Sequence, residues 1–253
     1  SPWLVTGGAG YIGSHVTRKL RESGRRVVVL DDLSSGHRQF VGDATDDGIR
    51  FVEGNVVDPV AVDAAIGALG EPVRGVVHLA GYKYAGVSVQ RPLHTYTQNV
   101  TAMQVLLERL AAHEVSLLVF SSSAATFGTP DVDLVTETTP TRPESPYGES
   151  KLIGEWLIRD VARVRELRHT SLRYFNVVGA RYADLYDSSP HNLFPLVLKA
   201  LTEGRTPSVN GTDYPTPDGS CVRDYVHVDD LALAHVAAAE AIEAGRVLEP
   251  VYN

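Results

Sequence analysis

The chain has 253 residues, 43% of them hydrophobic and 21% charged, and a net charge of −8. This profile is typical of a globular protein with a sizeable core, and the sequence shows no Lys/Arg cluster of the kind that follows a nucleic-acid backbone. The single cysteine, Cys221, excludes an internal disulfide, and no apolar run is long enough to span a membrane. Because the chain opens directly on a strand-like segment without a charged leader, we expect a cytoplasmic enzyme.

Three glycines separate the first predicted strand, residues 3–5, from a helix pattern that ends near Gly24. Gly7, Gly10 and Gly13 form G-x-x-G-x-x-G at this strand-to-helix turn. Without side chains there, backbone N–H groups and the helix dipole can approach a pyrophosphate. The spacing therefore predicts a dinucleotide site.

Asp31 ends the next predicted strand, residues 27–30. An acid about 20 residues beyond the glycines is placed to accept a hydrogen bond from a ribose 2′-hydroxyl, and it would repel a 2′-phosphate. The sequence therefore predicts NAD rather than NADP. An ordinary strand-end acid is the alternative if the glycine pattern is a coincidence.

The rest of the chain alternates strands and helices. Further strands are predicted at 49–54, 75–81, 117–120 and 172–176, and helices at 58–70, 87–113 and 152–165. This alternation specifies an α/β fold with a doubly wound parallel sheet, a Rossmann fold, whose ligands bind beyond the carboxyl ends of the strands. Ser123, Gly81 and the segment after residue 176 should lie at that edge.

Tyr147 and Lys151 are four residues apart, in a stretch that opens the helix predicted over 152–165. Residues so spaced on a helix share a face, so the Lys151 ammonium can approach the Tyr147 phenol. A phenol has a pKa of about 10, and a neighbouring cation favours its ionised form. The pair is therefore a candidate base, although the same pattern occurs by chance in many helices.

Several motifs together resemble those of the extended short-chain dehydrogenase/reductase family. They are T-G-G-A-G-Y-I-G at 6–13, L-D-D-L-S-S-G at 30–36, H-L-A-G-Y-K at 78–83, F-S-S-S-A-A-T-F-G at 120–128, S-P-Y-G-E-S-K at 145–151 and L-R-Y-F-N at 172–176. Within this family, G-T-D-Y-P-T-P-D-G at 211–219 followed by V-R-D-Y-V-H-V at 222–228 closely resembles the UDP-glucose 4-epimerases. The similarity covers essentially the whole chain.

The resemblance implies NAD-dependent 4-epimerisation of a UDP-hexose, UDP-glucose or UDP-galactose, through a 4-keto intermediate and a tightly bound NAD. Ser123 would bond the 4′-hydroxyl, and Tyr147 would act as base and acid. Lys151 would bind the nicotinamide ribose and lower the pKa of Tyr147. An intermediate that turned about its diphosphate tether would then be reduced on its other face.

The resemblance also implies two sets of binding residues. The cofactor contacts would be Gly7, Gly10, Tyr11, Ile12, Gly13, Asp31, Asn55, Val56, Leu79, Ala80, Lys83, Asn99, Ser121, Tyr147, Lys151 and Tyr174. The substrate contacts would be Lys83, Ser123, Tyr147, Phe175, Asn176, Asn192, Leu193 and Arg223. Arg223 would hold the diphosphate. The structural alternatives are an ion pair of Arg223 with Asp224 or Asp229, and a strand-end cap by Asn176.

Three positions depart from the family pattern. Asn55 stands where an aspartate usually faces the adenine, and an amide oxygen can still accept from the exocyclic amine. Asn210 stands where an aromatic ring commonly stacks on the uracil, a contact of about 1–3 kcal/mol in other base-stacking proteins, which leaves the identity of the base open. Val87 stands where a glutamate is frequent.

Some chemistry is disfavoured by missing residues. Related dehydratases and decarboxylases carry an acid just after the serine, where this chain has Ala124 and Ala125. The histidines show no metal-binding spacing, so we expect no metal site and a structural role for His78, His94 and His227.

We expect a NAD-binding Rossmann domain over 1–170 and mainly a smaller substrate-binding lobe over 171–253, interleaved with returning Rossmann segments. Residues 251–253 read as a strand of that lobe, and the part of a family chain that governs N-acetylated substrates would follow it. Helices 87–113 and 147–166 would make a homodimer by four-helix packing. The alternatives are a 4-epimerase of UDP-glucuronate, a UDP-N-acetylhexosamine or a UDP-pentose, a 4-keto reductase, and a non-enzymatic NAD sensor.

Overall fold

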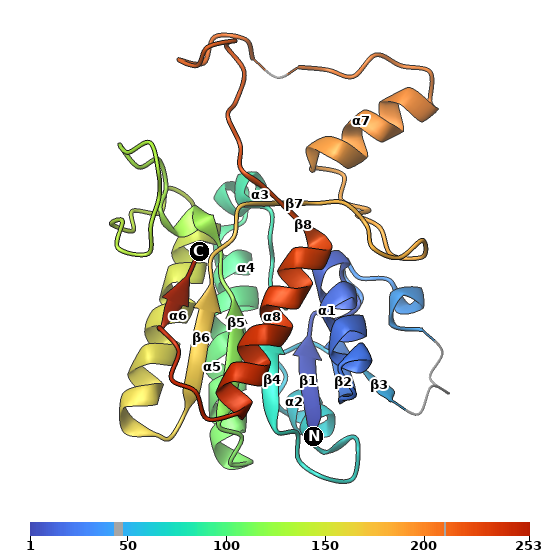
Figure 1. The fold of residues 1–253 in the computed structure, drawn as a ribbon, viewed down its shortest axis with the longest axis vertical. Coiled ribbons are helices and arrows are strands. Elements are labelled where there is room, and N and C mark those ends of the chain that lie inside the picture. The colour runs from blue at the N-terminus through green and yellow to red at the C-terminus, as the bar shows by residue number, and fades with distance from the viewer. Residues whose placement is uncertain (43–47, 210) are drawn as a thin grey trace.

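A seven-stranded sheet forms the centre of the computed structural model, which describes residues 1–42, 48–209 and 211–253 (Figure 1). Its order is β3-β2-β1-β4-β5-β6-β9, and all six pairings are parallel. The strands are β1 Pro2–Thr6, β2 Arg26–Asp31, β3 Ile49–Glu53, β4 Gly75–His78, β5 Leu117–Ser121, β6 Arg168–Leu172 and β9 Val251–Tyr252. The strand order reverses between β1 and β4, which confirms the predicted Rossmann sheet.

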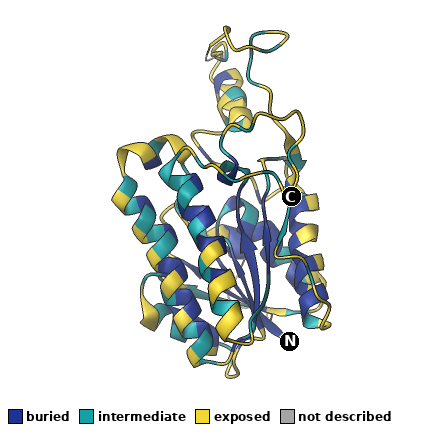
Figure 2. Ribbon diagram, turned by 90° about the vertical axis from the view of Figure 1, so that its left-hand side faces the viewer, coloured by how far each residue is buried: buried dark blue, intermediate teal, exposed yellow. Residues whose placement is uncertain are grey.

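Helices cover both faces of this sheet, so its central strands β1, β4 and β5 are buried along their whole length and are mostly apolar (Figure 2). In β1, Leu4 faces one core cluster while Trp3 and Val5 face the other. The first cluster packs under α2 Pro59–Gly67, α5 Ala102–Ala112 and α6 Pro146–Val164. The second packs under α1 Tyr11–Glu22 and α8 Val228–Glu243. Alternation along one strand thus supplies both cores.

The helix predicted over residues 87–113 is not continuous, and that prediction was wrong. The segment forms α3 Ala85–Gln90, α4 Pro92–Tyr96, a π-helical stretch Thr97–Thr101 and then α5. Proline has no N–H to donate, and it disfavours helical geometry in the residue before it. Arg91 accordingly leaves the helix, with φ −131° and ψ 57°.

Helix α6 begins at Pro146, six residues before the predicted start of the helix at residue 152. Proline is well suited to the first helical position, and the Ser145 hydroxyl caps the helix by accepting a bond from the Gly148 N–H at 3.2 Å. Tyr147 and Lys151 therefore both lie in the first turns of α6.

The last part of the chain contributes to two sheets. Beyond β6, the strand β7 Asn176–Val178 pairs in parallel with β8 Tyr225–His227. Between them, α7 Leu193–Thr202 stands above the carboxyl edge of the main sheet (Figure 1). Short 3-10 helices span η1 Arg38–Val41 and η3 Ala124–Thr126. No helix of the described residues is long and apolar enough to cross a membrane.

Two predictions near the C-terminal part were wrong. The strand expected over 172–176 is β6, which ends at Leu172, because the chain leaves the sheet there. Residues 251–252 do not belong to a separate lobe. They form β9 at the edge of the main sheet, where the Arg173 N–H donates to the Tyr252 carbonyl at 2.8 Å. So short a strand carries no pattern that assigns it to one sheet or the other.

Candidate active site

The glycine turn between β1 and α1 is closed to side chains. Gly7 has φ +73°, and a Cβ on it would lie 2.7 Å from the Ala80 nitrogen. A Cβ on Gly13 would lie 2.0 Å from the Gly7 carbonyl oxygen. Gly10 is the N-cap residue of α1, whose first turn holds no acidic side chain. The turn therefore presents a bare helix N-terminus, which fits a pyrophosphate.

The end of β4 lies against this turn. The backbone N–H groups of Leu79 and Ala80 donate to the Thr6 carbonyl at 3.1 and 3.0 Å. In the first turn of α1, Ile12 packs against the adjoining core, and the Tyr11 hydroxyl donates to the Gly179 carbonyl at 2.5 Å. Four of the predicted cofactor residues therefore surround the glycine turn: Tyr11, Ile12, Leu79 and Ala80.

Asp31 ends β2 beside the same turn and is 8% exposed. Its carboxylate accepts bonds from the Ala9 N–H and the Leu33 N–H, both at 2.9 Å. Burial raises the pKa of Asp31, whereas these two hydrogen bonds oppose the rise. Each carboxylate oxygen has a second lone pair, so the residue can still accept from ribose hydroxyls. This arrangement fits NAD.

Asn55 is held by its neighbours at the end of β3. Its amide nitrogen donates to Asp32 at 2.7 Å and to Gln98 at 3.0 Å, and its oxygen accepts from the Val57 N–H at 3.0 Å. Val56, the next residue, is buried in the core. Asn210, which stands where the family pattern has an aromatic residue, lies outside the described residues.

The structure brings Ser123, Tyr147 and Lys151 together at the carboxyl edge of the sheet. Ser123 follows β5, and its hydroxyl hydrogen-bonds the Tyr147 phenol. The Lys151 ammonium lies 5.9 Å from the centre of the Tyr147 ring and donates to the Ser121 carbonyl at 2.9 Å. A hydroxyl, a phenol and a buried ammonium therefore line one site, which can exchange a proton with a bound alcohol.

Burial dominates the titration of this site. It lowers the pKa of Lys151 to about 8, and the carboxylate of Glu155 opposes that change. It also raises the pKa of Tyr147, while the bond with Ser123 lowers it. In the protein alone the phenol is thus a weaker acid than usual, contrary to the expected effect of Lys151. The expected lowering of the Tyr147 pKa remains a prediction for the complex with cofactor.

Asn99 lies in the π-helical stretch and fixes the loop after β4. Its side-chain oxygen accepts from the Tyr82 N–H at 2.6 Å, and its nitrogen donates to the Ser150 hydroxyl at 2.8 Å. A Cβ on Gly81 would lie 2.9 Å from the side-chain oxygen of Asn99 and 3.8 Å from the Lys151 ammonium. The loop can pass between Asn99 and Lys151 because residue 81 is glycine.

Tyr174 and Ser121 form a directed hydrogen-bond chain with His235 of α8. The His235 Nδ1 lies 2.8 Å from the Leu231 carbonyl, so this nitrogen carries the proton. Burial lowers the pKa of His235 to about 4, which leaves its Nε2 as an acceptor for the Ser121 hydroxyl at 3.2 Å. Ser121 in turn accepts from the Tyr174 hydroxyl at 2.7 Å. The chain holds the Tyr174 ring beside the site.

The other predicted substrate residues are not joined to Tyr147 by any contact within the described residues. Asn176 begins β7, and its side-chain amide donates to the Asp224 carbonyl just before β8 at 3.1 Å, so its contact here is structural but is not a cap at the end of a strand. Asn192 occupies the N-cap position of α7, but its side-chain amide donates to Asp187 at 2.6 Å and makes no capping bond to the helix. The remaining members of this group are exposed, and they are Lys83, Phe175, Leu193 and Arg223.

Arg223 does not form either ion pair that was considered for it. Its guanidinium donates to the Val222 carbonyl at 2.8 Å. Asp229 pairs instead with Lys19 at 3.0 Å. Among the described residues Arg223 makes no ion pair, which leaves its charge available to an anionic ligand.

Four polar residues around the site were not singled out from the sequence: Ser122, Glu155, Arg173 and His235. All four are less than 9% exposed. Glu155 could have been found, because it lies four residues after Lys151 on the same helix face. His235 could not, because nothing in the sequence shows that α8 returns to β5.

The histidines expected to be structural have structural contacts. The His78 Nδ1 lies 2.7 Å from the Thr6 hydroxyl, and its ring stacks on Phe120. His227 caps α8 by accepting from the Asp229 N–H at 3.1 Å, and the ring of His94 packs on Tyr82.

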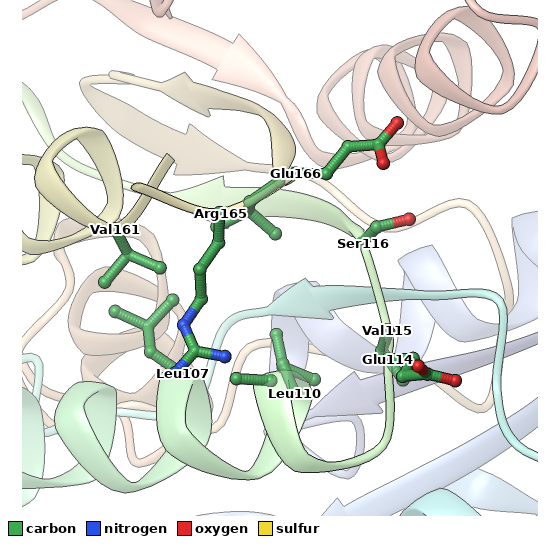
Figure 3. Close-up of a pocket in the computed structure, with 10 residues that line it drawn as sticks. Leu107, Leu110, Glu114, Val115, Ser116, Val161, Arg165 and Glu166 are labelled. Carbon is green, nitrogen blue, oxygen red and sulfur yellow. The ribbon is translucent and has the colours of Figure 1, made fainter. Parts of the chain in front are cut away.

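A cavity of about 350 Å³ lies between the ends of α5 and α6 (Figure 3). It is lined by Leu107, Leu110 and Arg165, and by Ser116 and Leu167, which precede β5 and β6. This is the amino end of the strands, whereas Tyr147 lies at the carboxyl end. The cavity is therefore separate from the candidate active site.

Comparisons with known proteins agree with these features. Residues 3–253 match the NAD dependent epimerase/dehydratase family. A UDP-glucose 4-epimerase of Corynebacterium glutamicum is 44% identical over 247 residues, which are 96% of this chain and 72% of that protein. The structure of UDP-glucose 4-epimerase from Brucella ovis in complex with NAD matches with a TM-score of 0.88 and 38% identity, over 98% of this chain and 75% of that one.

A UDP-glucose-4-epimerase from Stenotrophomonas maltophila, solved with bound NAD and formylated UDP-arabinopyranose, has the same TM-score of 0.88 and 38% identity, over 97% of this chain and 75% of that one. These matches confirm the resemblance that the sequence motifs indicated. The family match over residues 3–253 includes the glycine turn, the helix that carries Tyr147 and Lys151, and the segment after β7. This chain belongs to the NAD dependent epimerase/dehydratase family.

Proposed function

We propose that the protein is a NAD-dependent 4-epimerase that interconverts UDP-glucose and UDP-galactose. The observation that carries this proposal is the meeting of Ser123, Tyr147 and Lys151 at the carboxyl edge of the sheet, beside a glycine turn that fits a dinucleotide. The named relatives act on the same class of substrate. In such a site a single phenol can serve both halves of an epimerisation.

The cofactor would be held by the residues around the glycine turn and by Lys151, with Asp31 accepting from the adenosine ribose. NAD, when bound, supplies a reversible acceptor for the hydrogen that leaves C4 of the sugar with its electron pair. The carboxylate of Asp31 would disfavour a 2′-phosphate and so NADP. The bare N-terminus of α1 would face the pyrophosphate.

Tyr147 would take the proton of the 4-hydroxyl as the carbonyl forms, and would return it when the alcohol is regenerated. Ser123 would bond the same oxygen and keep it beside the phenol. The Lys151 ammonium would stabilise the phenolate that forms, since it lies against the Tyr147 ring in a buried site. The expected substrate contacts Lys83, Phe175, Asn176, Asn192, Leu193 and Arg223 would hold the nucleotide.

Inversion requires that the sugar present both faces to the same site. The Arg223 guanidinium makes no ion pair within the part of the chain that the structure describes and is suited to a diphosphate, so the nucleotide could stay bound while the 4-keto sugar turns. Ala124 and Ala125 follow Ser123 and cannot move protons. The site therefore has no acid there to start elimination or decarboxylation, which favours epimerisation.

A UDP-pentose is the second candidate substrate. It is favoured by the Stenotrophomonas maltophila relative, whose structure holds a formylated UDP-arabinopyranose. The pyranose ring of a pentose lacks the C6 group, so a site open at C6 would accept both classes. Relative kcat/KM values for UDP-glucose, UDP-xylose, UDP-glucuronate and UDP-N-acetylglucosamine would rank the substrates.

The experiment that tests the proposal uses the purified protein without added cofactor. UDP-glucose and UDP-galactose should interconvert, and denaturation should release NAD in a ratio of one per chain. A requirement for external NADPH would identify a reductase instead. Binding of NAD without turnover of any nucleotide sugar would favour the sensor alternative.

We further propose a homodimer formed through α4, α5 and α6. Leu93 of α4 and Val164 of α6 are each 80% exposed and Trp156 of α6 is 46% exposed, so α4 and α6 carry apolar side chains that a second copy would cover. Light scattering should give twice the mass of one chain, and Trp156→Glu should reduce it to that of one chain. An unchanged mass would contradict this interface.

The division into a cofactor unit, residues 1–170, and mainly a substrate unit, residues 171–253, is kept as a proposal. The position of α7 above the main sheet supports the substrate unit. α8 and β9 lie against or in the main sheet and are the returning Rossmann segments within residues 171–253. We also propose a cytoplasmic location, because NAD and UDP-sugars are cytoplasmic metabolites. Cell fractionation would test it.

A further inference from the structure

A buried ion pair lies directly behind the candidate active site. Both guanidinium arms of Arg173 bond the Glu155 carboxylate, at 2.9 Å from Nε and 2.6 Å from Nη2. The Ser122 hydroxyl donates to the same carboxylate at 2.5 Å. Glu155 is 8% exposed, Arg173 6% and Ser122 0%. Arg173 also stacks on the ring of Phe127, with 4.8 Å to its centre.

The pair joins three elements that carry the site. Glu155 lies on α6, one turn after Lys151. Ser122 lies at the end of β5, between Ser121, which accepts from Lys151, and Ser123. Arg173 immediately precedes Tyr174 after β6. One carboxylate therefore fixes the serine run and the segment after β6 to the helix that carries the phenol and the ammonium.

A buried ion pair is weak evidence for stability, because the cost of removing two charges from water offsets their attraction. Two well-packed apolar side chains would serve a purely structural purpose as well. The bidentate geometry instead fixes distance and direction, which a reaction site requires. We propose that Glu155 is a positioning residue for the epimerisation, setting Ser123 and Lys151 against Tyr147 through Ser122 and Arg173. The inference rests on the proposed function.

Glu155 also sets the charge around Lys151. The titratable groups that interact directly with this lysine are His78, Tyr147 and Glu155. Arg173 is paired with Glu155, and Tyr174 and the neutral His235 bond Ser121, whose carbonyl accepts from the ammonium. Burial lowers the pKa of His78 to about 3 and raises the pKa of both tyrosines, so these three are neutral at pH 7. Glu155 and Arg173 remain as the charged pair, and Glu155 raises the pKa of Lys151.

Two variants separate position from charge. Glu155→Asp keeps the charge but shortens the side chain, so kcat should fall about tenfold to a hundredfold with little change in KM, since a misplacement of 1 Å can cost about 10²-fold. Glu155→Gln keeps the length but removes the charge. It should shift the alkaline limb of the kcat profile to lower pH by about one unit, the usual effect of one nearby charge.

The matched control is Asp63→Asn, which removes a carboxylate bonded to Arg109 at 2.7 Å on helices far from the site. It should lower thermal stability and leave kcat and its pH profile unchanged. If both Glu155 variants behave like this control, the role is merely structural and the proposal is overturned. If Glu155→Gln does not fold, Arg173→Lys, which keeps the charge but loses the fork, should lower kcat as Glu155→Asp does.

Crystal structures separate this inference from the proposed function. A wild-type protein that turns over no UDP-hexose would end the proposed function, whatever Glu155 does. The positioning claim is then decided by the Glu155→Asp structure. Displacement of the Ser122–Ser123 backbone relative to Tyr147 supports it, and an unchanged backbone overturns it.

Discussion

The ammonium of Lys151 donates to the carbonyl of Ser121 at 2.9 Å, and this bond ties helix α6 to the carboxyl end of β5. Lys151 is only 6% exposed, and burial brings its pKa down to about 8. At neutral pH this lysine is still largely protonated, and burying its charge lowers the stability of the folded protein. The site thus keeps a cation where the fold alone would favour an apolar side chain.

Replacing Lys151 by Met should separate stability from activity. The folded pKa lies below the ordinary value of 10.5, so the cost of burying the charge is present below pH 8 and is relieved as the pH rises from 8 toward 10.5. The variant should raise the free energy of unfolding at pH 7 by about 1–3 kcal/mol, after allowing for the lost hydrogen bond. Turnover should be lost. A variant that is less stable at pH 7 would contradict this account.

Tyr147→Phe should abolish epimerisation while the protein still folds and retains NAD. Removal of a general base typically costs about 10²–10⁴ in rate. The control is Tyr252→Phe, which deletes a hydroxyl that accepts from the Glu249 N–H at 3.0 Å away from the site. Turnover and released NAD are measured on both. Wild-type rates in Tyr147→Phe would refute the role of the phenol.

Gly13→Ala should release the cofactor. The added Cβ would lie 2.0 Å from the Gly7 carbonyl oxygen, so the turn must move away from the helix N-terminus. Gly67→Ala is the matched control, because a Cβ there meets nothing within 4 Å and it lies at the end of α2. The first variant should contain little NAD and the second a full complement. Equal NAD content in both would exclude the glycine turn as the binding site.

His78→Asn should weaken the pH dependence of the free energy of unfolding below pH 6.5. Burial lowers the folded pKa of His78 to about 3, against 6.5 when exposed. Above pH 6.5 the histidine is neutral in both the folded and the unfolded state and costs no stability. As the pH falls from 6.5 toward 3, the unfolded state binds a proton that the folded state does not, so the free energy of unfolding falls by at most about 1.4 kcal/mol per pH unit. Urea unfolding at several pH values measures the slope. The exposed His191→Asn should keep the wild-type slope, and equal slopes in both variants would contradict the assignment to His78.

The sequence predicted the sheet, the glycine turn, Asp31 and the Tyr147–Lys151 pair, because each has a local pattern with a physical cause. It did not predict the break at Arg91, although Pro92 was visible, since the apolar stripe of α5 suggested one long helix. It also missed the contacts made across the fold. Ser122, Glu155 and His235 are ordinary residues until α6 and α8 are placed against β5.

The fate of the hydrogen on C4 tests the central claim most directly. UDP-galactose carrying deuterium at C4 is converted in ordinary water with no cofactor added, and the product is analysed by NMR and mass spectrometry. We predict UDP-glucose with the deuterium retained at C4. Loss of the deuterium to water would contradict transfer to a bound nicotinamide, and with it the proposed roles of Tyr147, Ser123 and Lys151.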